Sequence, residues 1–78
     1  MITKKDAIAL GKAIVAARDR EVLFNGSDDK VRYHANGVCS YALDNLWYDI
    51  LPSKVKEQFG WSLEAFKDLV WPQSAVQS

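Results

Sequence analysis

Cys39 and His34 are the only cysteine and the only histidine in the 78-residue chain, and they are the first candidates for chemistry. Five residues apart, they could meet across a turn as a thiol nucleophile and its base. Such a pair also needs a third group that orients the base and a loop that stabilises an oxyanion, and neither is recognisable here. Cys39 also falls on the apolar side of an amphipathic stretch, where free cysteines are commonly buried. We therefore expect neither residue to be catalytic.

The carboxylates form neither a catalytic pair nor a metal site. Asp44 and Asp49 lie five residues apart in a stretch with helical spacing, so they diverge around the helix and cannot act as an acid–base pair. Asp28 and Asp29 lack the spaced oxygen ligands of a calcium loop, and one histidine with one cysteine cannot build a zinc site. The four glycines are too far apart for a phosphate-binding loop. The sequence predicts a protein that is not an enzyme and has no metal or cofactor.

Residues 54–71 resemble a helix-turn-helix, because a short helix, a glycine turn and a capped second helix follow one another. Lys56 departs from that motif, since it stands where a small residue packs between the helices. The second helix carries Glu64 and Asp68 against only Lys67, and this excess of negative charge would repel phosphates. A small nucleic-acid-binding regulator that uses residues 54–71 is therefore the alternative function, not the favoured one.

Charge and cysteine usage narrow the possible partners and the cellular location of the protein. Ten basic and ten acidic residues give a formal net charge of zero, so no overall field attracts nucleic acid or an anionic membrane. No stretch approaches the roughly 18 to 20 apolar residues that span a bilayer. A single cysteine cannot form an internal disulfide, which favours a reducing, cytoplasmic location.

The strongest pattern lies in residues 38–51, which we expect to be a core helix that ends before Pro52. Its apolar residues recur at spacings of three and four, and they are Cys39, Ala42, Leu43, Leu46, Trp47, Ile50 and Leu51. A first helix is expected to begin at Thr3, because Thr3 and Asp6 have the spacing of a capping box. A short helix over residues 54–59 and a last helix that begins after Ser62 complete the helical segments.

Residues 20–37 decide the fold class, and two interpretations compete. Residues 21–24 and 30–35 are rich in β-branched and aromatic side chains, which favours two short strands joined by a loop over residues 25–29. A variant of this interpretation pairs strands across a turn at Asn36 and Gly37. Alternatively, the first helix continues to Phe24, and Ser27 caps a further helix that ends at Gly37. We favour the hairpin.

The expected fold is therefore α+β, a small single domain over residues 1–72 with a helix, a β-hairpin and then three helices. The alternative is an all-α bundle of four or five helices. Residues 73–78 are expected to be a frayed C-terminal tail. At this length, one domain has a core that is only just large enough to hold a fold.

Nine aromatic residues are more than a core of this size can hide, so some are expected on the surface, where they favour protein contacts. We expect a non-catalytic protein–protein interaction module that acts by covering a partner's surface. Small proteins of this kind are common among inhibitors and adaptors of phages and mobile elements, although no motif here matches such a family. The sequence also leaves a homo-oligomer open. The expected partner-binding residues are Tyr41, Asp44, Tyr48, Asp49 and Trp71.

Overall fold

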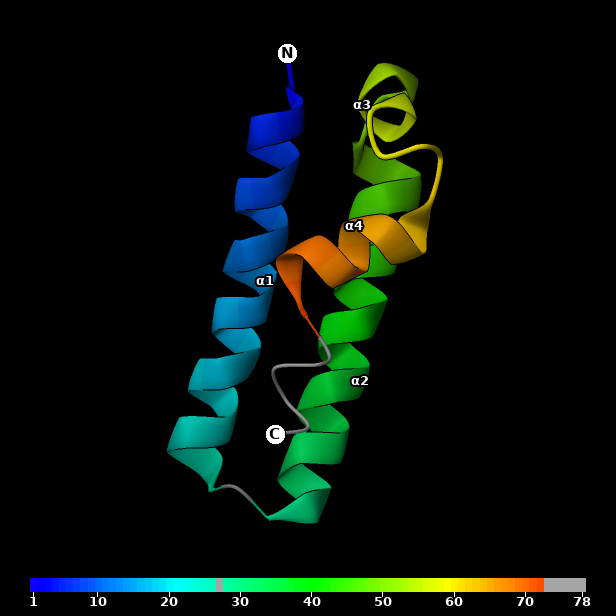
Figure 1. Cartoon of the computed structure of the whole chain (residues 1–78). Helices are drawn as coiled ribbons and strands as arrows, with labels where there is room; N and C mark the ends of the chain where they lie inside the picture. The colour runs from blue at the N-terminus through cyan, green and yellow to red at the C-terminus, as the bar shows by residue number, and fades with distance from the viewer. Residues whose placement is uncertain (27, 73–78) are drawn as a thin grey trace.

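A computed structural model describes residues 1–26 and 28–72 of the chain. The elements in order are α1 (Lys4–Asn25), α2 (Asp29–Asn45), the π-helix η1 (Leu46–Ile50), α3 (Ser53–Glu57) and α4 (Leu63–Val70). Helices α1 and α2 run antiparallel side by side, and α2 continues directly into η1 (Figure 1). The expected frayed tail, residues 73–78, lies outside the described residues.

The expected β-hairpin is wrong, because residues 20–25 and 29–37 are helical and the described part of residues 20–37 contains no strand. Residues 21–24 form the last turns of α1, and residues 30–35 form the first turns of α2. Over the described residues the fold is therefore a small all-helical domain of four α-helices and the short η1, which corresponds to the all-α alternative that the sequence left open. Asn36 and Gly37 lie inside α2, so they form no turn.

Tertiary packing explains why these short β-prone segments are helical. Val31 and Ala35, four residues apart, lie on one side of α2 and are half-buried and buried, while Tyr33 and His34 remain exposed. Asp28 caps the start of α2, because its side chain accepts a hydrogen bond from the backbone amide of Val31 at 2.9 Å. Ser27, which the helical interpretation places at this cap, lies outside the described residues.

Helix α1 begins as the sequence predicts. The Thr3 hydroxyl accepts a hydrogen bond from the Asp6 amide at 3.2 Å, and the Asp6 carboxylate accepts one from the Thr3 amide at 3.0 Å. This reciprocal pair is the expected capping box. Further along, Gly11 allows α4 to approach closely, because a Cβ atom on Gly11 would lie 2.8 Å from Val70 Cγ1.

The expected core helix over residues 38–51 begins earlier, at Asp29, and changes from α-helix to π-helix at Leu46. A hydrogen bond from the Leu51 amide to the Leu46 carbonyl, at 2.9 Å, spans five residues. The wider turn shifts the register by about one residue. As a result Leu51 is buried at 4% exposure, whereas Ile50, expected on the apolar face, is 54% exposed.

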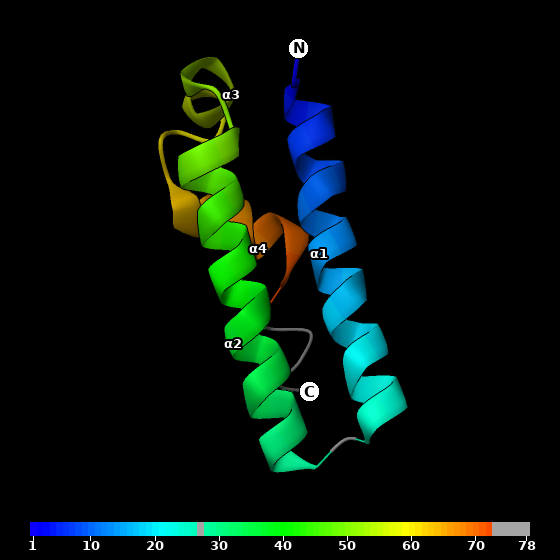
Figure 2. The same cartoon turned by 180° about the vertical axis from the view of Figure 1, so that it is seen from behind.

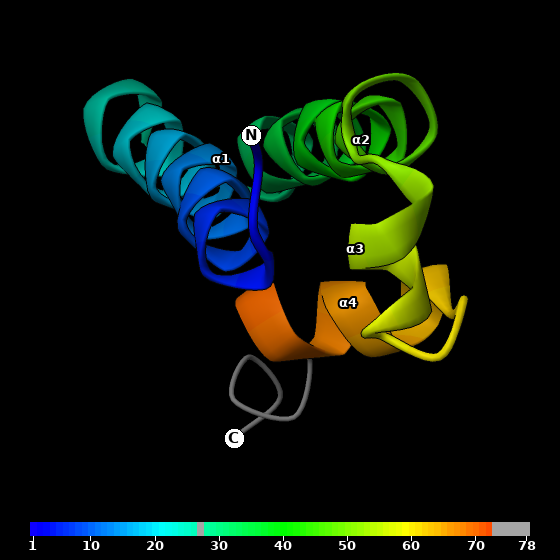
Figure 3. The same cartoon turned by 90° about the horizontal axis from the view of Figure 1, so that it is seen from above.

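The core lies where α4 crosses one face of the α1–α2 pair (Figure 3). Three aromatic rings form its centre, with centroid distances of 6.0 Å for Trp47–Phe59, 5.6 Å for Trp47–Phe66 and 5.1 Å for Phe59–Phe66. Phe66 comes from α4, which begins where the Ser62 hydroxyl accepts a hydrogen bond from the Ala65 amide. The α4 helix thus covers one face of the pair and leaves the other face open.

Candidate functional site

The outer side of α2 and η1 carries three exposed tyrosines, and we call Tyr33, Gly37, Tyr41 and Tyr48 the tyrosine face. The side chains of Tyr33, Tyr41 and Tyr48 are 84%, 69% and 67% exposed. Spacings of eight and seven residues place the three tyrosines within about a quarter-turn of one another on a helix. Each presents a large apolar ring with a hydroxyl at its edge, which suits a protein contact.

A shallow hollow of about 310 Å³ lies in the part of the tyrosine face between Tyr33 and Tyr41, with His34, Gly37 and Val38 completing its lining. No side-chain or other backbone atom lies within 4 Å of the position that a Cβ atom would take at Gly37. The absence of a side chain at Gly37 therefore opens room for a group from a partner. Farther along, the Lys56 ammonium lies 6.0 Å from the Tyr48 ring centroid, at the outer limit of a cation–π contact.

The structure does not bring all five expected partner-binding residues into one surface. Tyr41, Tyr48 and Asp49 are exposed on the outer side of α2 and η1. Asp44 is half-buried, and its Oδ1 lies 2.7 Å from the Lys67 ammonium, which also donates a hydrogen bond to Ser40 at 3.1 Å. This ion pair joins α2 to α4, so Asp44 has a structural partner already.

Trp71 lies apart from the tyrosine face. It is half-buried at the end of α4, and the Arg18 guanidinium lies 5.9 Å from the centroid of its ring. Arg18 also donates a hydrogen bond to the Asn36 side chain at 2.8 Å and pairs with Asp19 at 2.7 Å. Trp71 therefore takes part in a contact between α1, α2 and α4.

Cys39 is buried at 2% exposure on the α1-facing side of α2, as the apolar stripe predicts. Desolvation by this burial raises the pKa of its thiol, which disfavours the reactive thiolate. His34 is exposed. Among the described residues, no cluster of three or more histidine, cysteine or acidic side chains could hold a metal ion.

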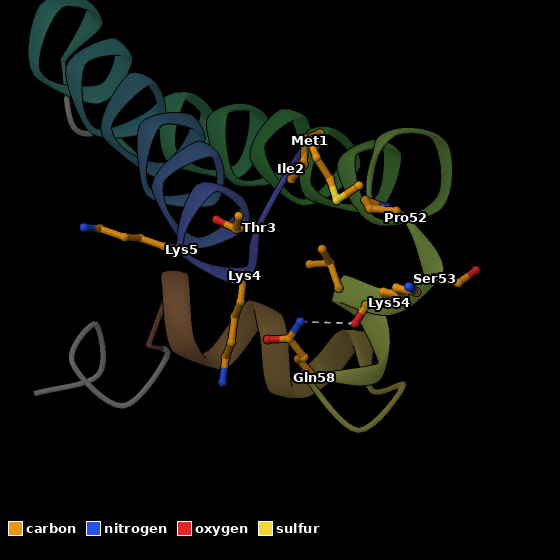
Figure 4. Close-up of a pocket in the computed structure, with 10 residues that line it drawn as sticks. Met1, Ile2, Thr3, Lys4, Lys5, Pro52, Ser53, Lys54 and Gln58 are labelled. Atoms are coloured by element: carbon orange, nitrogen blue, oxygen red, sulfur yellow. Dashed lines mark hydrogen bonds between the residues drawn. The ribbon is translucent and has the colours of Figure 1, made fainter.

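A second depression, of about 540 Å³, lies between the start of α1 and α3 (Figure 4). Its apolar lining comes from Ile2, Pro52 and Val55, and Lys4, Lys5 and Lys54 lie around it. The lysine side chains do not converge on one point, and Lys5 points away from the depression. The Lys4 ammonium lies 5.3 Å from the Phe59 ring centroid, so this lysine contributes to packing. These lysines build no focused anion site.

The segment that resembles a helix-turn-helix forms α3 and α4, and α3 has only five residues. Glu64 and Asp68 are exposed on α4, while Lys67 is half-buried and paired with Asp44. The exposed charges of α4 are therefore acidic. Among the described residues, no helix combines the length and hydrophobicity needed to cross a membrane.

Sequence reasoning missed Tyr33 as a surface residue of this site. The signal is present in the sequence, because Tyr33, Tyr41 and Tyr48 have helical spacing. The strand interpretation of residues 30–35 hides this signal, because it separates Tyr33 from the helix that carries the other two tyrosines.

Comparison with protein-family models, with curated proteins and with solved structures finds no match. Any function proposed for the chain therefore rests on its own geometry and chemistry.

Proposed function

We propose that this chain is a non-catalytic protein-binding module, and that the tyrosine face is the surface that contacts the partner. One observation carries the proposal: three exposed tyrosines lie along the outer side of one continuous helical segment, and two of them, Tyr33 and Tyr41, border a hollow beside Gly37. Tyrosine is enriched in protein interfaces because its ring buries a large area at little entropic cost and its hydroxyl can still hydrogen-bond.

The rigidity of the support favours this function. Tyr33 and Tyr41 project from an α-helix whose opposite side is packed through Ala35, Cys39 and Leu43 against the rest of the core. Side chains on such an element lose less freedom on binding than side chains on a loop, so more of the contact energy remains as affinity. The module would act by covering part of the partner's surface, as an inhibitor or adaptor does.

The cytoplasm is the proposed setting. Cys39 is a free, buried thiol, and a reducing compartment keeps such a thiol unoxidised. The nucleic-acid alternative gains no support from α4, because its exposed charges are acidic.

Affinity capture from the native host lysate, followed by binding measurements with the purified partner, tests the proposal. We expect Tyr41→Ala and Tyr48→Ala each to weaken binding by about 30-fold or more, the loss typical of an aromatic hot spot. Trp61→Ala is the matched control, since Trp61 is also exposed, at 61%, but lies in the turn before α4. Circular dichroism verifies that each variant is folded.

Two results contradict the proposal. Unchanged binding by both folded tyrosine variants would remove the tyrosine face from the interface. A steeply salt-dependent shift of mixed-sequence DNA at low salt would instead support the nucleic-acid alternative.

A further inference from the structure

The face of the α1–α2 pair opposite α4 is an apolar groove that no other described element covers, and Figure 2 looks onto this side. Two adjoining hollows, of about 550 Å³ and 200 Å³, follow the line between the two helices and share Ile14, Ala17 and Ala42. We call this surface the hairpin groove, and its apolar residues are Leu10, Ala13, Ile14, Ala17, Ala35, Val38, Cys39, Ala42, Leu46 and Ile50. It adjoins the tyrosine face at Val38, which lines a hollow on each of the two surfaces.

Large apolar side chains stand exposed along the hairpin groove. Leu10, Val38 and Ile50 are 43%, 51% and 54% exposed. Ile50 is there because the π-helix rotates it out of the core while Leu51 takes the buried position. Single exposed apolar residues are common on proteins, but a continuous apolar groove between two helices marks a contact surface.

Apolar residues also recur every seven residues along α1. Each of Leu10, Ala17 and Phe24 follows the previous one by seven residues, so the three lie along one side of α1. Ala17 is small and lies midway between the two larger side chains, and Phe24 is 81% exposed. About 10 Å of helix separates Ala17 from either neighbour. The row is therefore symmetric in position, with a small residue at its centre.

We infer that the hairpin groove binds a second copy of this chain, in a two-fold symmetric dimer whose axis passes beside Ala17 and Ala42. A half-turn about that axis exchanges the two ends of the groove. It brings Phe24 of each copy to the larger hollow of the other, between Leu10 and Ile50. The small residues at the axis let the helices approach closely, and the two hairpins together form a four-helix arrangement.

The size of the face fits a dimer. Helix α1 has 22 residues, and α2 with η1 has 17 and five, so both arms are about 33 Å long. With the axis beside Ala17 and Ala42, about eight residues on either side of it overlap in each arm, so the shared length is about 25 Å. With two helices that are each about 10 Å across, the overlapping face measures about 500 Å² on each copy, and the two copies bury about 1,000 Å² in total. This total reaches the roughly 1,000 Å² expected of a specific interface.

Charge also favours a second copy as the occupant. The formal net charge is zero, so two copies approach without overall repulsion. No charged residue lines the larger hollow, and the smaller hollow is bordered by one residue of each sign, Arg18 and Glu21. The centre of the interface therefore forms without desolvating an unpaired charge.

Sedimentation velocity tests the inference over about 1 µM to about 500 µM, where a dimer with a micromolar Kd changes its monomer fraction. We expect a species of twice the 8.8 kDa monomer mass to form as concentration rises. In Ala17→Glu, two like charges meet near the axis, and dimerisation should weaken by about 100-fold or more. Ala16→Glu is the control, since Ala16 is also an exposed alanine of α1 but lies on another side of the helix.

A cross-linking experiment tests the same geometry without adding charge. Residues beside a two-fold axis face their own copies, so Ala17→Cys should form a disulfide-linked dimer under mild oxidation. Ala16→Cys and the wild-type chain, with its buried Cys39, should not. A monomer at every concentration overturns the inference. So does a dimer that folded Ala17→Glu leaves unchanged, or equal cross-linking through both positions. A groove that binds a helix of another protein, with no self-association, overturns it as well.

Discussion

Gly11→Ala and Gly37→Ala form a matched pair that tests how α1 and α4 pack. Both glycines lie inside helices, and replacing glycine by alanine in an exposed helix interior stabilises it by about 1 kcal/mol. The two sites differ in their surroundings. At Gly37 the new methyl group meets nothing within 4 Å, whereas at Gly11 it would lie 2.8 Å from Val70 Cγ1 and 3.1 Å from Phe66 Cζ.

This difference in surroundings sets the expected magnitudes. Gly37→Ala should raise the free energy of unfolding by about 0.5 to 1 kcal/mol. Gly11→Ala gains the same helical preference but must push α4 away, and overpacking of this kind costs about 1 to 3 kcal/mol. Its net effect should therefore lie between about zero and 2 kcal/mol of destabilisation. The two variants should differ by about 1 to 3 kcal/mol.

Urea unfolding followed by tryptophan fluorescence measures both variants, because Trp47 is buried at 4% exposure in the core and reports its loss. Thermal unfolding gives an independent reading, in which 1 kcal/mol corresponds to about 4 to 8 °C for a domain of this size. If Gly11→Ala is stabilised as much as Gly37→Ala, then α4 does not press on α1 at Gly11, and the described packing is refuted.

Four further predictions concern the cap, its carboxylate, the π-helix and the thiol. Thr3→Ala should lower the unfolding temperature by a few degrees, since losing a cap costs about 1 kcal/mol. A hydrogen bond from the Thr3 backbone holds the pKa of Asp6 in the folded protein below its ordinary value. The stability that Asp6 contributes should therefore be complete above the ordinary pKa and decline as the pH falls through the lower pKa of the folded state. A pH titration of unfolding without this decline would contradict the capping box. In urea unfolding of dilute protein, Leu51→Ala should lower the free energy of unfolding by about 2 to 5 kcal/mol and Ile50→Ala by less than about 1 kcal/mol, because only Leu51 is buried. The reverse order would mean that the π-helical register is wrong. The Cys39 thiol, whose pKa is raised by burial, should resist a thiol-specific reagent in the folded protein and react fully in urea, so rapid labelling without denaturant would contradict its burial.

Much of the local structure can be predicted from the sequence. The caps at Thr3 and Ser62 depend on hydrogen bonds within one turn of helix, so nearby residues are sufficient to predict them. The apolar stripe of residues 38–51 predicts a core helix, and Cys39, Leu43 and Trp47 are buried as expected. Two of the tyrosines in the proposed site, Tyr41 and Tyr48, are exposed because helical spacing places them outside the apolar stripe.

Neighbouring residues are thus enough to set where α1 and α4 begin and which residues form the core stripe of α2. The fold class depends on packing between helices, because Val31 and Ala35 gain more by packing as a helix on α1 than their segment gains from strand preference. Tertiary contacts also favour the π-helix, which buries Leu51 in place of Ile50. They likewise pair Asp44 of α2 with Lys67 of α4. These features depend on residues that are distant along the chain, and their energies arise only when the helices meet.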